Sequence, residues 1–88
     1  MANNPSAAKR ARQALRNRAR NRVTRSTART NARRVREAAA SGDATAYETA
    51  LSNAYSALDR AAKKGSIHTG KADRAKRRLA ALRSQVAA

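Results

Sequence analysis

The strongest constraint on this chain is an N-terminal stretch that carries many positive charges and no negative one. Residues 1–36 contain 12 basic side chains and no acidic one, whereas residues 37–59 contain four acidic side chains and no basic one. Residues 60–88 are basic again, and the 88 residues have a formal net charge of +16. Such a charge repels itself in a compact monomer. We therefore expect a polyanionic partner, most simply nucleic acid, whose phosphates exchange counterions for basic side chains.

The apolar residues are mostly alanine, which limits the core that the chain can bury. There are 24 alanines and only 12 larger apolar residues, with no Phe and no Trp. A length of 88 residues allows one domain at most. Because burying a Leu or Val stabilises by only about 1.5–3 kcal/mol, we expect marginal stability alone and a gain in stability on binding.

Several classes of protein are excluded or disfavoured by what the sequence lacks. There is no cysteine, and therefore no disulfide framework or thiolate metal site. No apolar run is long enough for a transmembrane helix, and the N-terminus does not resemble a signal peptide. We expect a cytoplasmic protein that does not enter a membrane.

Three helices are predicted, at residues 6–41, 43–64 and 69–86, and no strand. Gly42 is typical of a helix end and Asp43 of a helix start, while Gly65 and Gly70 bracket a short loop. Ala-, Arg- and Leu-rich segments between these positions favour helix. The predicted fold class is all-α, a three-helix bundle with a long, protruding basic N-terminal helix.

The second and third predicted helices each have one apolar face. In the second, Tyr47 and Tyr55 belong to this face; we interpret them as core residues, with base stacking as the alternative. The opposite face is polar and uncharged, which is typical of a surface in water. The third helix has a coiled-coil-like seam, made of Ala72, Ala75, Leu79, Leu82 and Val86.

The first helix is too long for its neighbours to cover. At about 1.5 Å per residue, its 36 residues span roughly 54 Å and the second helix roughly 33 Å. Its N-terminal part is charged all round the axis, which is not typical of a packed helix. We expect it to fray in solution, because like charges at i, i+4 repel, and to become helical among phosphates; a disordered tail is the alternative. Its candidate RNA-binding residues are Lys9, Arg10, Arg12, Arg16, Arg18, Arg20 and Arg22.

Nothing in the sequence favours catalysis. The five acidic residues form no pair at i, i+3 or i, i+4, and His68 has no nearby cysteine. There is also no glycine-rich phosphate loop. We predict that the chain is not an enzyme, uses no cofactor and binds no metal.

The remaining basic residues each have two interpretations. Arginine outnumbers lysine 16 to 5, which suits bidentate contacts to phosphate but is also expected from a GC-rich genome. The outer face of the third helix is either solvated or in contact with RNA, and we favour contact. The residues that we expect to point outward there are Arg74, Lys76, Arg77 and Arg78. His68 is a capping residue or a donor to the RNA backbone. The candidates outside the N-terminal part are Arg25, Ser26, Arg29, Arg33, His68, Lys71, Arg74, Lys76, Arg77 and Arg78.

Two segments give the chain a family resemblance. The C-terminal one reads Ala61-Ala62-Lys63-Lys64-Gly65-Ser66-Ile67-His68, followed by Lys71-Ala72-Asp73-Arg74-Ala75-Lys76-Arg77-Arg78-Leu79. The N-terminal one reads Ser6-Ala7-Ala8-Lys9-Arg10-Ala11-Arg12-Gln13. Together with Arg25, Ser26 and Thr30, these segments resemble the family of bacterial small-subunit ribosomal protein number twenty over nearly the whole chain.

The resemblance implies a ribosome-bound protein that contacts small-subunit ribosomal RNA directly and stabilises its fold during assembly. It implies contacts with the 5′ domain and the long helix of the 3′ minor domain. The matching positions are Lys9, Arg10, Arg12, Arg25, Ser26, His68, Lys71, Arg74, Lys76 and Arg78. Two residues depart from the family pattern. Gly70 replaces a common Asn, which predicts a looser loop, and Asp73 replaces a small neutral residue.

Two other functions are compatible with part of the pattern. A DNA-compacting nucleoid protein would have the same charge, but the ordered apolar faces favour RNA. A membrane-surface helix would carry bulky apolar residues opposite its charges, and the first helix has mostly alanine there. Nothing in the sequence indicates a homo-oligomer.

Overall fold

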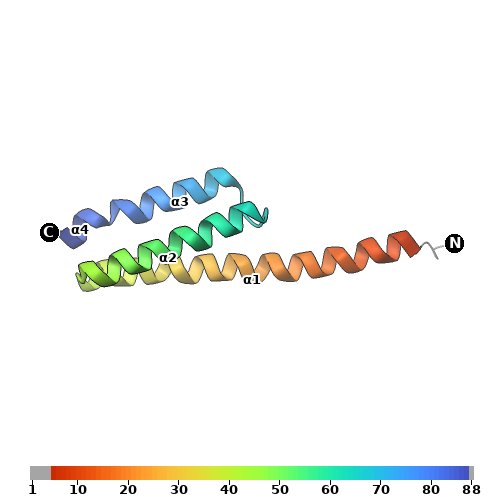
Figure 1. Ribbon diagram of the computed structural model, residues 1–88, viewed down its shortest axis with the longest axis horizontal. Coiled ribbons are helices and arrows are strands. Elements are labelled where there is room, and N and C mark those ends of the chain that lie inside the picture. Colours follow the sequence, from red (N-terminus) through yellow and green to blue (C-terminus); the bar gives the residue numbers. More distant parts are fainter. Residues whose placement is uncertain (1–4, 88) are drawn as a thin grey trace.

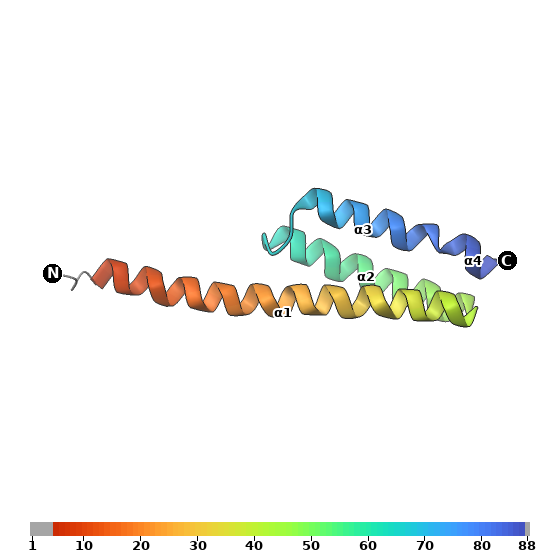
Figure 2. The same ribbon diagram turned by 180° about the vertical axis from the view of Figure 1, so that it is seen from behind.

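The computed structural model describes residues 5–87 and places them in four helices. These are α1 (Pro5–Ser41), α2 (Ala44–Lys63), α3 (Thr69–Ala81) and the short α4 (Arg83–Ala87). α2 lies antiparallel along the C-terminal half of α1, and α3 folds back along α2 (Figures 1 and 2). The fold class is all-α, as predicted, and the N-terminal part of α1 protrudes from the bundle.

The molecule, with the protruding part of α1, is elongated and flat, with dimensions of 67 × 20 × 13 Å. α3 packs mainly on α2 and touches α1 only lightly, whereas α4 reaches the C-terminal part of α1. Towards its own N-terminus α3 lies farther from α1 (Figures 1 and 2). α2 is therefore the element on which the other helices assemble.

The turn between α1 and α2 follows from Gly42 and Asp43, the residues predicted to end the first helix and begin the second. Gly42 has φ of 78°, a left-handed conformation that ends α1. Asp43 then caps α2, and its side chain accepts a hydrogen bond from the backbone N–H of Ala46 at 3.1 Å. This cap satisfies one of the backbone donors that a helix start leaves unpaired.

The turn between α2 and α3 is a Schellman motif that is also tied to α1. Gly65 has φ of 75°, and the N–H of Ser66 donates to the carbonyl of Ala61 at 2.9 Å. The hydroxyl of Ser66 bonds to the side-chain oxygen of Asn21 at 3.0 Å. This contact fixes the loop against α1 at the point where the bundle ends. Gly70 lies in the first turn of α3 and not in this loop.

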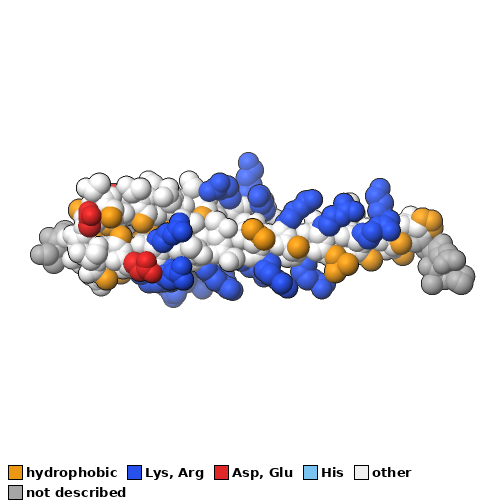
Figure 3. Space-filling view, turned by 90° about the horizontal axis from the view of Figure 1, so that it is seen from below, with side chains coloured by type: hydrophobic (Ala, Val, Ile, Leu, Met, Phe, Trp, Pro, Cys, Tyr) orange, Lys and Arg blue, Asp and Glu red, His pale blue; other side chains and the backbone are white. Residues whose placement is uncertain are grey.

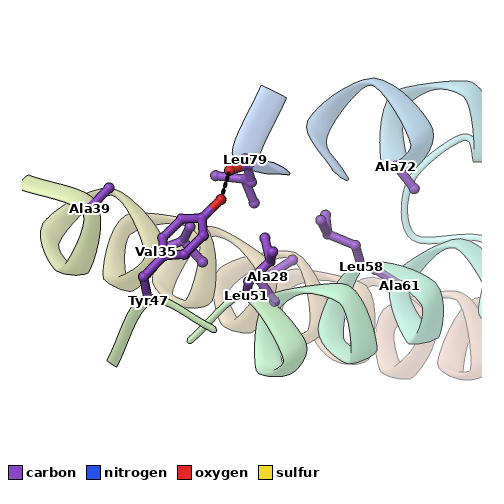
Figure 4. Close-up of a cluster of buried hydrophobic side chains, with 10 residues drawn as sticks. Ala28, Val35, Ala39, Tyr47, Leu51, Leu58, Ala61, Ala72 and Leu79 are labelled. Atoms are coloured by element: carbon purple, nitrogen blue, oxygen red, sulfur yellow. Dashed lines mark hydrogen bonds between the residues drawn. The ribbon is translucent and has the colours of Figure 1, made fainter. Parts of the chain in front are cut away.

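The core contains few large side chains, and α2 supplies most of them. Tyr47 is 1% exposed, and Val35 of α1 is fully buried beside it (Figure 4). Alanines allow the helix axes to approach closely. The remaining members of the core cluster are Ala28, Ala39, Leu51, Ala54, Leu58, Ala61, Ala72 and Leu79. Tyr55 is half-buried against them, so both tyrosines pack on the core as predicted.

The predicted third helix, 69–86, is interrupted at Leu82. The hydroxyl of Tyr47 donates to the carbonyls of Leu79 at 2.7 Å and Ala80 at 3.3 Å, in the last turn of α3. The helix tightens there, because the N–H of Leu82 donates to the carbonyl of Leu79, only three residues earlier, at a distance of 3.2 Å. A side chain that enters the ladder of backbone hydrogen bonds ends or bends a helix. The sequence pattern of α3 and α4 did not contain this signal, because the donor lies on α2.

Residues 5–20 form the protruding part of α1, which we call the arm. Every residue of the arm is exposed, and its 16 residues extend roughly 24 Å. The arm is helical in the structure, and its predicted fraying without RNA stays a prediction. Among the described residues, no helix combines the length and apolar character that a membrane span requires.

Replacing Tyr47 by Phe tests the hydrogen bonds at the end of α3. We expect Tyr47→Phe to lower the free energy of unfolding by about 1–1.5 kcal/mol, because a buried hydrogen bond is lost while the ring still fills its site. Urea denaturation measures the change. Tyr55→Phe is the matched control, since the hydroxyl of Tyr55 makes one longer hydrogen bond, 3.3 Å to the backbone carbonyl of Lys76, in a half-buried site. An equal loss in both variants would contradict the special role of Tyr47.

The ion pair between Glu48 and Arg83 should make part of the stability depend on pH. Arg83 donates to both carboxylate oxygens of Glu48, at 2.8 and 3.2 Å, and these hydrogen bonds lower the pKa of Glu48. Stability from a lowered pKa is present above the ordinary pKa of Glu and disappears as the pH falls through the folded-state value. Glu48→Gln should therefore lower the Tm slightly at neutral pH and not at acid pH. A Tm difference between wild type and Glu48→Gln that persists unchanged at acid pH would contradict this. Glu37→Gln is the control, because Glu37 pairs only weakly with Arg33 within the same helix.

Candidate nucleic-acid interface

The arm concentrates positive charge on a rod that makes no contact with the core. Its basic side chains point in several directions around the axis, and the acidic side chains visible in Figure 3 lie over the bundle instead. A helix of this kind can contact phosphates on more than one side. Its basic residues are Lys9, Arg10, Arg12, Arg16, Arg18 and Arg20.

A row of arginines continues from the arm along one face of α1. Its members are separated by three or four residues, which places them on one side of a helix. All are exposed, and Ser26 lies exposed beside them. Adjacent members rise by roughly 5 Å along the axis, a distance similar to the separation of successive phosphates along a strand. This arginine row consists of Arg18, Arg22, Arg25, Arg29, Arg33 and Arg36.

The fold brings part of the arginine row close to α3. Arg25 and Arg29 of α1 and Lys71 of α3 line the same cavity, although more than 40 residues separate them in sequence. All three belong to the predicted interface. The sequence placed them on separate helices, and the structure shows that they share one surface feature.

The outer face of α3 is also basic, with one exception. Arg74, Arg77 and Arg78 are exposed, as expected. The expectation that Lys76 points outward is wrong. Its side chain is 23% exposed, its ammonium lies 2.6 Å from Asp59, and it sits 5.4 Å from the centre of the Tyr55 ring. Its hydrogen bond to Asp59 raises the pKa of Lys76, so Lys76 joins α3 to α2.

His68 caps α3, and the same geometry leaves its other ring nitrogen available. Its Nδ1 accepts a hydrogen bond from the N–H of Gly70 at 2.9 Å. In the neutral ring the proton is then on Nε2, which is a donor. A Cβ at position 70 would lie 3.2 Å from Nδ1, so Gly70 suits this cap. The two interpretations of His68 are therefore compatible.

Each acidic side chain interacts with another group of the protein. Asp43 caps α2, and the other four lie within 4 Å of a basic side chain. These ion pairs occupy only three of the 21 basic residues in the described part of the chain: Arg33, Lys76 and Arg83. Arg33 pairs weakly with Glu37 at 3.5 Å and stays two-thirds exposed. Most of the positive charge therefore faces solvent.

Sequence reasoning missed several basic residues next to this surface. Arg60 and Lys64 of the α2 end line a second cavity, of about 190 Å³, against Val23 and Thr27 of α1. Lys63 is exposed in the same turn. The sequence feature that could have indicated them was the basic cluster just before Gly65. Basic residues are also typical of the last turn of a helix, whatever its function. On α1, Arg36 was missed, although its spacing continues the arginine row.

Comparison with known proteins identifies relatives of closely similar length. The family model described as ribosomal protein S20 matches residues 2–83. The small ribosomal subunit protein bS20 of Ralstonia pickettii is 47% identical over 88 residues, which is all of both chains. Those of Alcanivorax borkumensis and Bordetella avium are 46% and 47% identical, over 90% of both chains and over 92% of this chain and 93% of the relative.

The matched region contains all of α1 with its arm, α2 and α3, and therefore both segments that carry the resemblance in the sequence. The family is one of ribosomal structural proteins and not of enzymes, in agreement with the prediction from the residues. The extent of the match and the identities show that this chain belongs to the ribosomal protein S20 family.

Proposed function

We propose that the chain is a ribosome-bound structural component of the small subunit that binds small-subunit ribosomal RNA directly. The observation that carries this proposal is the continuous basic surface formed by the arm and the arginine row, without a free carboxylate. Family membership supports the location in the small subunit. In this reading, the arm neutralises phosphates of neighbouring RNA segments and holds them together while the subunit assembles.

The shape of the molecule supports contact with more than one RNA segment. The arm exposes basic side chains all round its axis, whereas the bundle presents them on α1 and the outer face of α3. One end of the rod can lie between RNA helices while the other lies against one of them. The 5′ domain and the long helix of the 3′ minor domain are the two segments that we propose.

The arm should account for much of the salt dependence of binding. We expect tight binding to small-subunit ribosomal RNA that survives excess duplex DNA. Replacing Arg12, Arg16, Arg18 and Arg20 by Gln should reduce the slope of log K against log salt by about 3, since each lost phosphate contact contributes roughly 0.7–0.9. Filter binding at several salt concentrations measures both quantities.

The matched control changes the same four residues to Lys, which keeps their charge. This variant should retain the salt slope and lose affinity only to the extent that bidentate arginine contacts matter. An unchanged slope in the Gln variant would place the RNA elsewhere on the molecule. Loss of all binding in the presence of duplex DNA would favour the nucleoid function.

Two substitutions separate the capping role of His68 from its proposed contact with RNA. His68→Ala should lower the free energy of unfolding by about 1 kcal/mol, because the cap is lost. His68→Asn should restore most of that stability, since Asn is a good N-cap, but it removes the outward Nε2 donor. We expect both variants to bind RNA more weakly. Full affinity in His68→Asn would show that His68 acts only as a cap.

A further inference from the structure

A groove of about 220 Å³ opens between α1 and α3, above α2. Its floor is apolar, and the residues at its rim are cations. Leu58 of α2 forms part of the floor and Lys71 part of the rim. The floor residues are Ala28, Ala32, Leu58, Ile67 and Ala75, and the rim residues are Arg25, Arg29, Arg36 and Lys71.

The groove exists because small side chains stand where two helices separate. Ala32 and Ala75 face it from α1 and α3, and both remain partly exposed. Ile67, in the loop before α3, is also partly exposed there. Larger residues at positions 32 or 75 would fill the space. The apolar floor therefore remains accessible in a chain that has few large apolar residues to bury.

The chemistry of the groove selects the class of its occupant. No residue that lines it is acidic. The carboxylates on the three lining helices all have basic partners: Glu37 pairs with Arg33 and Glu48 with Arg83. Asp59 and Asp73 both pair with Lys76. A ligand with a flat apolar part and a negative charge fits this groove, because its apolar part can contact the floor while its charge pairs with the cations of the rim. The volume lies below the range of roughly 300–1,000 Å³ for drug-sized ligands, which favours a single small, flat group.

The arginine row adds the second observation. Arg25, Arg29 and Arg36 belong to that row as well as to the groove. A strand whose phosphates follow the row would pass directly along the rim of the groove. One base turned out of its stack would then reach the floor, and guanidinium planes are suitable surfaces for such a base.

We propose that this groove binds one unstacked nucleotide of the RNA, with the base on the apolar floor and its flanking phosphates on Arg25, Arg29 and Lys71. This inference rests on the proposed function and adds a specific site to it. It distinguishes the protein from a polycation that reads only the RNA backbone, because a continuously stacked helix would leave the floor empty.

Filling the groove tests the proposal without removing a charge. Ala32→Leu and, separately, Ala75→Leu should weaken binding to small-subunit ribosomal RNA about tenfold, the order expected for one lost base contact. The salt slope should not change, because no phosphate contact is removed. Ala40→Leu is the control, since Ala40 is exposed on α1 outside the groove. Circular dichroism and urea denaturation check that each variant folds.

The outcomes separate this inference from the proposed function. If the wild type binds tightly and both filled variants bind like Ala40→Leu, the groove proposal is wrong and the proposed function stands. If the wild type shows no preference for ribosomal RNA over duplex DNA, both fail.

A second readout locates the base directly. Ribosomal RNA irradiated with short-wavelength ultraviolet light, which activates every base, should crosslink to the peptide that includes Ile67 and Lys71 when it is bound to the full chain. The crosslink should decrease in Ala75→Leu. Crosslinks confined to the arm, or unchanged in Ala75→Leu, would overturn the proposal.

Discussion

The structure depends on a single apolar surface, the face of α2 that carries Tyr47, Leu51 and Leu58. α1 contributes only one fully buried side chain larger than alanine, Val35, and α3 contributes Leu79. Burial of apolar surface is the main force available for folding, so the other helices are ordered where they touch α2. α2 has 20 residues and α1 has 37. The arm is the part of α1 that extends beyond this surface.

The same constraint determines how the charges are used. With so little apolar surface, the bundle adds ion pairs that join helices, Lys76 with Asp59 and Arg83 with Glu48. Exposed pairs of this kind contribute little each, but they place the few carboxylates away from the arm. The remaining cations have no internal partner among the described acidic residues. The basic residues that join helices, Lys76 and Arg83, are thus different from those of the arm and the arginine row.

Much of the fold and part of the candidate interface could be predicted from the sequence. Helix bounds follow from local signals such as Gly42, Asp43 and Gly65, and the length of the arm follows from the rise per residue. The break at Leu82 and the inward position of Lys76 could not be predicted in this way. Their causes, the hydroxyl of Tyr47 and the carboxylate of Asp59, lie on another helix. The groove was missed for the same reason, since its lining comes from three helices and a loop.

The continuity of α1 through the root of the arm has a geometric consequence. Asn21 and Ser66 hold α1 against the loop, and the same unbroken helix carries the arm outward. The rotational phase of every arm residue is therefore set by the core, at 100° per residue. Inserting one alanine at the root would leave the charge unchanged but rotate the whole arm by that angle. The core therefore anchors the arm and also fixes the directions in which its side chains point. These directions can change while the net charge of the molecule stays the same.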